Sequence, residues 1–298
     1  IALLIPCFNE VRTVGKVVKD CKRAMPTATI YVFDNNSTDG TAQAAKEAGA
    51  QIVTSPFQGK GNVVRHMFQS INADVYILID GDDTYPVDYL EKMLAIFQRD
   101  KVDMVVGTRF EKYEKGSLRL LHRLGNRLIS TLISWLFKAR VTDVFSGFRI
   151  LSRRFVETVY LKSNRFEVET EMTLQALMKH FTIAEVPVPY RCRPQGSHSK
   201  LNTFSDGIST IKALLFIFKD YKPFAFFTFF AFLFFILGLI AGWFPIQDYI
   251  LYRYVYRVPL AILAVALEII AVVLFGVGLI LDTITNLHLE NQELLKRK

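Results

Sequence analysis

The sequence predicts an α/β fold, with a doubly wound and mostly parallel sheet, followed by a hairpin of two membrane-spanning helices. Three observations lead to this prediction. Apolar runs typical of buried strands alternate with helical patterns through the first two thirds of the chain. Polar clusters follow four of these strands. Two long, almost uncharged stretches occupy the C-terminal third.

Five strands and three intervening helices form the predicted sheet domain. The helical pattern at 11–25 places Val14, Val17 and Val18 on one face, and the helix that begins at Thr41 ends at Gly49. The third helical pattern, 59–71, is entered through two glycines. The predicted strands are 1–6, 29–34, 50–55, 75–80 and 102–109.

The polar clusters PCFNE, DNNSTDG, DGDD and GTR each follow a predicted strand. Ligands of doubly wound sheets bind at the carboxyl ends of the strands, so these clusters predict one shared site. The chain has 298 residues, a net charge of +8 and only three, scattered cysteines, which make neither a disulfide framework nor a zinc cluster. Reduced thiols and a cytosolic domain over 1–205 are the expectation.

A long amphipathic helix is predicted over 117–138. Arg119, Arg123 and Arg127 recur every four residues, and Trp135 lies on another face. Such a helix suits the plane of a membrane surface, although an ordinary domain helix with a solvated basic face has the same pattern. The apolar C-terminal third favours the interfacial interpretation. A second, juxtamembrane helix is predicted over 206–222.

Two membrane spans are predicted at 224–244 and 259–281, the second interrupted only by Glu268. Four tyrosines in the linker and Trp243 form an aromatic belt. Lysines before the first span, together with the basic end of a tail over 282–298, favour both chain ends in the cytoplasm. The protein is therefore expected to be integral to a membrane, most simply a bacterial inner membrane. Glu268 is expected to make an interhelical or oligomer contact, with a role in passing lipid as the alternative.

The three carboxylates of Asp80, Asp82 and Asp83 follow one buried strand. Like charges so close together cost free energy unless a cation neutralises them. Mg²⁺ or Mn²⁺, held by Asp80 and Asp82 together with a substrate phosphate, would do so. Gly81 between them lets a ligand approach the backbone, and Asp83 is interpreted as a solvated turn residue or a helix cap.

The segments PCFNE, DNNSTDGT, GKGNVVR and DGDDTYP resemble, in order and spacing, the family 2 glycosyltransferases with the GT-A fold. DVFSGFR and GSHSK resemble the polyprenyl-phosphate branch of that family. The resemblance covers most of 1–205. It implies an inverting transferase that moves one sugar from a nucleotide donor, a UDP-sugar in preference, to a polyprenyl phosphate on the cytosolic leaflet. A homotetramer is compatible with it, and nucleic acid is not an implied partner.

The resemblance also implies the donor site. Asp34 would bond the base or ribose, Gly61 and Arg65 would close over the nucleotide, and Asp80 and Asp82 would meet the metal and diphosphate. Thr84 stands where many relatives have a glutamine that assists the metal. The residues assigned to the donor are Pro6, Phe8, Asn9, Glu10, Asp34, Asn36, Gly61, Arg65, Asp80, Gly81, Arg193 and Lys200.

The acceptor side follows from the chemistry of phosphate. A lipid phosphate is largely dianionic at neutral pH, so it can attack without losing a proton and needs cations to position it. The resemblance implies that Arg109 and Arg127, with Ser130 or Thr131, would grip it, and Arg149 is a further cation. The predicted catalytic residues are Asp82, Asp143, Arg109 and Arg127.

Asp143 leaves alternatives open. It would orient the acceptor, assist the metal, pair with Arg149 or act as a base, and pairing or positioning is preferred over base catalysis. Glu167, Glu169 and Glu171 are expected on one side of an extended segment, one of them pairing with a site arginine. The rival functions are a transferase that extends a lipid-linked saccharide, which needs a base, and a non-catalytic membrane protein that binds nucleotide or lipid.

Overall fold

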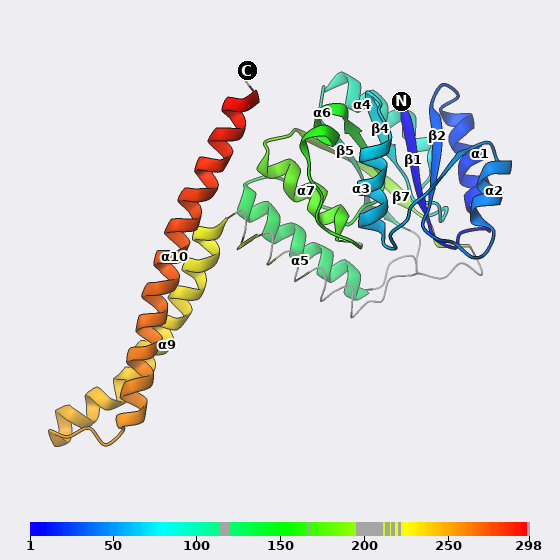
Figure 1. Ribbon diagram of the computed structural model, residues 1–298. Coiled ribbons are helices and arrows are strands. Elements are labelled where there is room, and N and C mark those ends of the chain that lie inside the picture. Colours follow the sequence, from blue (N-terminus) through cyan, green and yellow to red (C-terminus); the bar gives the residue numbers. More distant parts are fainter. Residues whose placement is uncertain are drawn as a thin grey trace. The chain divides into compact units, whose positions relative to one another are not determined.

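The computed structural model describes residues 1–113, 120–165, 167–194 and 222–296, together with 211, 215, 218 and 219. The chain forms two compact units, Ile1–Ala213 and Leu214–Lys298. The first unit contains a sheet covered by helices, and the second contains two long helices (Figure 1).

The sheet of the first unit has seven strands in the order β3-β2-β1-β4-β6-β5-β7. β6 runs antiparallel to β4 and β5, and the other pairs are parallel. The predicted doubly wound, mostly parallel fold is confirmed. The strands are β1 (Ala2–Cys7), β2 (Thr29–Asp34), β3 (Gln51–Thr54), β4 (Val75–Leu78), β5 (Met104–Tyr113), β6 (Arg149–Ser152) and β7 (Ile183–Tyr190).

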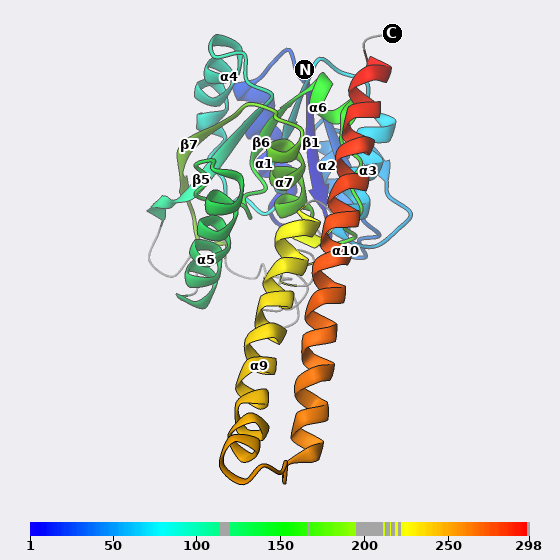
Figure 2. The same cartoon turned by 90° about the vertical axis from the view of Figure 1, so that its left-hand side faces the viewer.

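Helices cover both faces of the sheet because the strands are apolar on both sides (Figure 2). In β1, Leu3 and Ile5 face one core, whereas Ala2 and Leu4 face the other. The first core is closed by α1 (Val14–Ala24), α2 (Thr41–Glu47) and α4 (Leu90–Arg99), with the short 3₁₀ helix η1 (Val87–Tyr89) preceding α4. The second is closed by α3 (Lys60–Ser70), α6 (Arg153–Thr158) and α7 (Val168–Met178).

Two strands, β6 and β7, were not among those predicted. β6 has only four residues. β7 contains Pro187 and Pro189, which argue against a strand in sequence because proline has no N–H for the ladder. β7 is the outermost strand next to β5, and a sheet edge tolerates proline.

The segment with three glutamates was expected to be extended, and this expectation is wrong. Residues from Val168 onward form α7, a helix buried almost all round. Glu169 and Glu171 lie in its first turn, where the helix dipole favours negative charge. Two positions apart on a helix, Glu169 and Glu171 point to different sides and contact different partners.

The amphipathic helix is present as α5 (Leu120–Phe137), whose side chains are described from Gly125 onward. Ile129 and Ile133 point into the protein. Leu128 and Trp135 are 70% and 74% exposed. The apolar exposed stripe is thus on the outside of this unit. The side chains of Arg119 and Arg123 lie outside the described part.

The second unit is a helical hairpin of α9 (Pro223–Tyr252) and α10 (Val258–Lys296) (Figure 2). Two stretches of these helices, Pro223–Tyr252 and Val258–Leu287, are long and apolar enough to cross a membrane, and few of their residues are buried. α9 continues through Pro245 beyond the predicted end of the first span at 244, and α10 continues through most of the predicted tail. The predicted helix over 206–222 lies mostly outside the described residues.

The two helices of the hairpin approach each other closely at Gly238 and Glu268. A Cβ on Gly238 would lie 2.5 Å from Oε1 of Glu268, so the glycine leaves room for the carboxyl group. Where the helices turn, the backbone N–H of Arg257 donates to Asp248 at 3.2 Å.

Candidate active site

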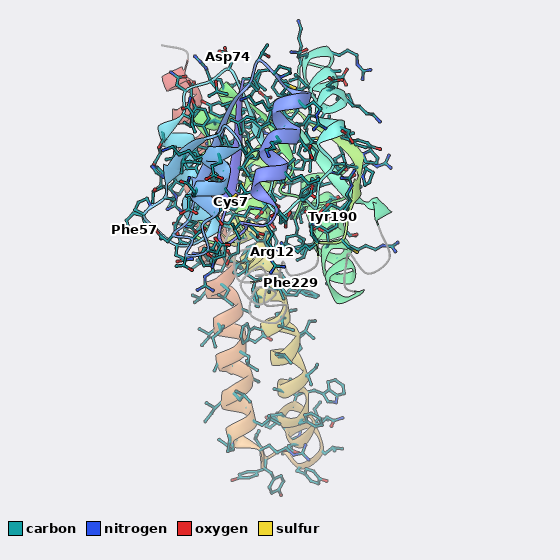
Figure 3. The ribbon with its side chains drawn as sticks, turned by 90° about the vertical axis from the view of Figure 1, so that its right-hand side faces the viewer. Cys7, Arg12, Phe57, Asp74, Tyr190 and Phe229 are labelled. Atoms are coloured by element: carbon teal, nitrogen blue, oxygen red, sulfur yellow. The ribbon has the colours of Figure 1, made fainter. Side chains whose placement is uncertain are left out.

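The carboxyl ends of β1, β2 and β4 meet at one edge of the sheet, and the predicted polar clusters lie together there. In Figure 3, Cys7, Phe57 and Tyr190 lie at this end of the unit. Asp74, which precedes β4, lies at the opposite end. The sequence expectation of one shared site at the strand ends therefore agrees with the topology.

The loop after β1 is clamped to the loop after β2. Pro6 is near the end of β1, and Phe8 follows the strand. The backbone N–H groups of Asn9 and Glu10 donate to Ser37 Oγ at 2.9 Å and Thr41 Oγ1 at 2.8 Å. Asn9 adopts a left-handed φ of 53°, as do Asn36 at 61° and Asp83 at 58°. Non-glycine residues rarely adopt this conformation, so the surrounding contacts must hold these three in place.

Only one of the two carboxylate oxygens of Asp34 accepts a hydrogen bond from the described residues. Its Oδ2 accepts the N–H of Ser37 at 3.2 Å, while Oδ1 is buried and accepts no hydrogen bond from the described residues. A buried carboxylate oxygen without a donor is costly, which makes this atom a candidate acceptor for a hydrogen bond from a ligand. Asn35 holds the neighbouring loop in place by bonding the carbonyl of Phe57 and the N–H of Gly59.

Asp80 is paired with Lys60, the lysine of GKGNVVR, for which the sequence predicted no role. Lys60 Nζ lies 2.5 Å from Asp80 Oδ1 and 2.7 Å from Glu169 Oε1. Burial alone would lower the pKa of Lys60, but the two carboxylates outweigh it and raise that pKa. The expected partner of the glutamate segment was an arginine, and it is Lys60 instead. Glu171 instead accepts the N–H groups of Lys162 and Ser163.

Asp82 is buried and has two partners. Its Oδ2 lies 2.6 Å from Arg193 Nη2, and its Oδ1 accepts the hydroxyl of Thr84 at 2.6 Å. Burial and then repulsion from Asp80 raise the pKa of Asp82, while Arg193 and Thr84 act against that rise. Thr84, in place of the usual glutamine, therefore orients Asp82 directly. Arg193 Nη1 also lies 3.7 Å from Glu10 Oε1.

The acidic cluster has the chemistry to hold a hard divalent cation. Asp80 and Asp82 repel one another, and a cation between them would offset that repulsion. Carboxylate oxygens are preferred ligands of Mg²⁺, which takes its other ligands from water and phosphate. Among the described residues no group of three or more His, Cys, Asp or Glu ligands forms. The site thus fits an ion completed by a bound diphosphate rather than a protein cage.

The backbone around these acids is tightly supported. A side chain on Gly81 would collide with the thiol of Cys7, and Thr13 Oγ1 donates to the Gly81 carbonyl at 2.7 Å. Asp83 forms a 2.7 Å ion pair with Lys16 rather than only facing solvent.

Arg109 and Asp143 form a buried bidentate pair. Arg109 Nε and Nη2 donate to Asp143 Oδ2 and Oδ1 at 2.8 and 2.9 Å, and the Arg109 N–H donates to Oδ2 at 3.1 Å. Burial alone would lower the pKa of Arg109, but the charge of Asp143 raises it. Arg109 also lies 5.4 Å from the ring centre of Tyr190. The sequence interpretation named Arg149 as the possible partner of Asp143, and the structure pairs Asp143 with Arg109.

Arg149 does not reach the surface, contrary to its predicted contact with an acceptor phosphate. Its side chain is fully buried in the sheet. The guanidinium donates to the carbonyls of Ser146, Val144 and Glu169 and to Thr173 Oγ1. Burial lowers the pKa of Arg149 to about 10. Arg149 holds β6 to α7, which leaves no donor directed to solvent.

Arg65 and Gly61, which were expected to close over the nucleotide, have contacts within the protein. Arg65 donates to the carbonyls of Leu161 at 2.8 Å and Ser163 at 3.0 Å. A side chain on Gly61 would collide with the Ser163 carbonyl. Both residues thus join α3 to the loop before α7. The motif GKGNVVR gives no sign of the Arg65 contacts, because they join residues that are 96 and 98 positions apart in the chain.

The remaining predicted residues divide by exposure. On α5, Arg127 and Thr131 are exposed, whereas Ser130 is 4% exposed and its Oγ has no partner among the described residues. Lys200 lies outside the described part of the chain.

The sheet topology is that of a GT-A-type glycosyltransferase fold. The acidic pair at the carboxyl edge of the sheet and the available Oδ1 of Asp34 agree with this class of protein. The chain belongs to glycosyl transferase family 2, whose model matches residues 2–160. It is 31% identical over 304 residues to glycosyltransferase AglJ of Haloferax volcanii, covering 98% of this chain and 96% of the relative.

Two further relatives are similar to this chain, and one of them has dolichyl phosphate in its name. A dolichyl-phosphate hexose transferase of Haloferax volcanii is 31% identical over 215 residues, covering 72% of this chain and 92% of that protein. Protein RfbJ of Shigella flexneri is 50% identical over 123 residues, 41% of this chain and 95% of that protein.

Solved structures show the same fold at low identity. Glucosyl-3-phosphoglycerate synthase from Mycobacterium tuberculosis, crystallised with Mn²⁺ and UDP-glucose, superimposes with a TM-score of 0.59 at 17% identity. The match covers 73% of this chain and 77% of that protein.

Proposed function

We propose that this protein is a membrane-anchored, inverting glycosyltransferase that transfers one sugar from a nucleotide donor to a polyprenyl phosphate on the cytosolic leaflet. A UDP-sugar is the preferred donor. Membership of family 2 supports the transferase chemistry. The relative named as a dolichyl-phosphate hexose transferase supports a lipid-phosphate acceptor.

The observation that carries this proposal is the state of Asp143. A hydroxyl acceptor requires a general base, whereas a phosphate is already ionised. Asp143 is fully buried and accepts four hydrogen bonds, three from Arg109 and one from the N–H of Phe145 at 3.1 Å. Each oxygen of this carboxylate already accepts two hydrogen bonds, so Asp143 serves as the counter-ion of Arg109 and has no acceptor position left for a substrate hydroxyl. An acceptor that brings its own negative charge suits such a site.

The donor half of the site supports a nucleotide diphosphate. Asp34 Oδ1 would accept a hydrogen bond from the base or ribose. Asp80 and Asp82 would hold Mg²⁺ or Mn²⁺, which supplies charge neutralisation for the departing diphosphate. Arg193, beside Asp82, would contact the same phosphates.

The proposed reaction is a direct displacement in which no proton moves. A phosphate oxygen attacks the anomeric carbon on the face opposite the nucleotide, and the bond from that carbon to the donor diphosphate breaks. Its electron pair remains on the diphosphate as the configuration at carbon inverts. Arg109 and Arg127 would offset the repulsion between acceptor and donor anions.

The membrane side of the proposal is supported by both units. Leu128, Leu132 and Trp135 form an exposed apolar stripe on α5, beside the exposed Arg127. This pattern suits the interface of a bilayer. The two apolar helices of the second unit would then anchor the chain.

Turnover of the purified full chain tests the proposal. A panel of labelled sugar nucleotides is incubated with undecaprenyl phosphate and Mn²⁺, with undecaprenol as the matched acceptor lacking phosphate. A labelled lipid that is labile to mild acid and absent with undecaprenol is expected. An acid-stable glycosidic product would instead support extension of a lipid-linked saccharide. No turnover with any donor would support a non-catalytic role.

A further inference from the structure

Two cations, Lys60 and Arg193, contact the acidic cluster of Glu10, Asp80, Asp82 and Glu169, and the structure holds them in different ways. Lys60 is fixed between Asp80 at 2.5 Å and Glu169 at 2.7 Å, and its side chain is 13% exposed. Arg193 contacts Asp82 at 2.6 Å and Glu10 at 3.7 Å, and its side chain is 25% exposed. Lys60 belongs to the first turn of α3, whereas Arg193 lies in the segment that follows β7.

Only one of these cations can leave at moderate cost. Removing Lys60 would abandon Glu169, whose side chain is 5% exposed and whose Oε2 has no partner within the described ranges. An uncompensated buried charge is strongly destabilising. Arg193, in contrast, contacts Asp82 Oδ2, an oxygen that would be available to a metal ion bound in this cluster. When a metal replaces the guanidinium there, Asp82 stays neutralised.

We infer that Arg193 is a placeholder cation, which occupies Asp82 in the metal-free protein and passes to the donor diphosphate when the metal binds. This inference rests on the proposed function for the identity of the donor. The four carboxylates, Glu10, Asp80, Asp82 and Glu169, outnumber Lys60 and Arg193 by two charges. The cluster therefore attracts a divalent ion even while Arg193 is in place. Arg193, displaced from Asp82, then lies beside the diphosphate that completes the metal's ligands.

Binding of Mn²⁺ and of UDP, measured separately and without any lipid acceptor, tests this exchange. The full chain in detergent is titrated with Mn²⁺ by electron paramagnetic resonance, and UDP is then titrated calorimetrically at saturating Mn²⁺. Arg193→Gln should bind Mn²⁺ alone roughly 10- to 100-fold more tightly, the range of one lost charge-assisted hydrogen bond. The same variant should bind UDP at least about tenfold more weakly. Arg193→Lys, which keeps the charge, should stay near wild type in Mn²⁺ binding.

The opposite signs are the decisive readout, because a merely structural arginine would weaken both binding steps. Arg193→Gln with unchanged or weaker Mn²⁺ affinity would overturn the inference. A second measurement uses the wild-type chain, so it is independent of how the variant folds. Phenylglyoxal modification of Arg193, followed by peptide mass spectrometry, should accelerate with Mn²⁺ alone and slow with Mn²⁺ and UDP. An unchanged modification rate with Mn²⁺ also overturns it.

Failure of the inference differs from failure of the proposed function. A wild-type chain that transfers sugar to the lipid phosphate, but whose Arg193→Gln variant loses affinity for Mn²⁺, refutes the exchange alone. A wild-type chain that binds neither Mn²⁺ nor UDP refutes both.

Discussion

Replacement of Asp143 by asparagine separates a counter-ion from a general base. The carboxylate accepts from Nε, Nη2 and the N–H of Arg109 and from the N–H of Phe145, at 2.8 to 3.1 Å. Asparagine has nearly the same shape, but it carries no charge and directs an NH₂ group toward donors. Arg109, whose side chain is 12% exposed, would then keep a buried charge without compensation.

The cost follows from this geometry. Breaking a buried ion pair by removing one partner costs about 3–5 kcal/mol. For a folding unit of this size, that loss corresponds to a fall of about 6–20 °C in Tm. The double variant Asp143→Asn/Arg109→Gln removes both charges, and it should regain much of the lost stability, because replacing both partners is close to neutral.

Thermal unfolding and a pH–rate profile together form the assay. Unfolding of wild type, the two single variants and the double variant gives the coupling between the charges. Transfer by Asp143→Asn is measured well below its Tm, at saturating donor, over roughly pH 5.5–8.5, the range of the second phosphate pKa near 6. We expect a loss of about tenfold, from a displaced Arg109, and a profile of unchanged shape.

The opposite pattern would refute the reasoning. If Asp143→Asn unfolds at the wild-type temperature, yet loses more than about 10²-fold in rate and the acid limb of its pH profile, then Asp143 is a base. The acceptor would then be a hydroxyl group, and the saccharide-extending function would be the better explanation.

Three further predictions address other parts of the molecule. A Cβ on Gly147 would lie 2.6 Å from Asp80 Oδ2, so Gly147→Ala should lower kcat/KM for the donor by about tenfold or more. A Cβ on Gly125 would meet no atom within 4 Å, so Gly125→Ala is the control and should not lower it. Equal effects of the two substitutions would contradict this packing argument. Trp135→Asp should reduce transfer to a long-chain lipid phosphate more than to a short soluble analogue, and equal losses would remove α5 from the membrane interface. At pH 8 a maleimide should label only Cys192 of the three cysteines in the native protein, and all three after denaturation. Cys7 and Cys21 are buried, and burial raises the pKa of both thiols, that of Cys21 to about 12, so both stay neutral. Rapid native labelling of a second cysteine would contradict the fold.

The sequence by itself determined the first five strands, the two long apolar helices and the edge of the sheet at which the polar clusters meet. Strands such as 29–34 and the two apolar C-terminal stretches are set by local periodicity and length, which can be read along the chain. Because parallel strands end at one edge, the DGDD and DNNSTDG clusters could be placed together without coordinates. The motifs, as a group, were enough to indicate the family.

The tertiary structure alone decided which charges are paired. Arg149 and Arg109 are both arginines next to apolar strand residues, and nothing in the local pattern distinguishes them. In the fold, Arg149 is enclosed between β6 and α7, whereas Arg109 meets Asp143, 34 residues away in sequence. Lys60 and Glu169 are likewise paired only by the fold: they lie on different helices, and Lys60 contacts both Glu169 and Asp80. Periodicity specifies the face on which a residue lies, but the partner on that face depends on how distant elements pack.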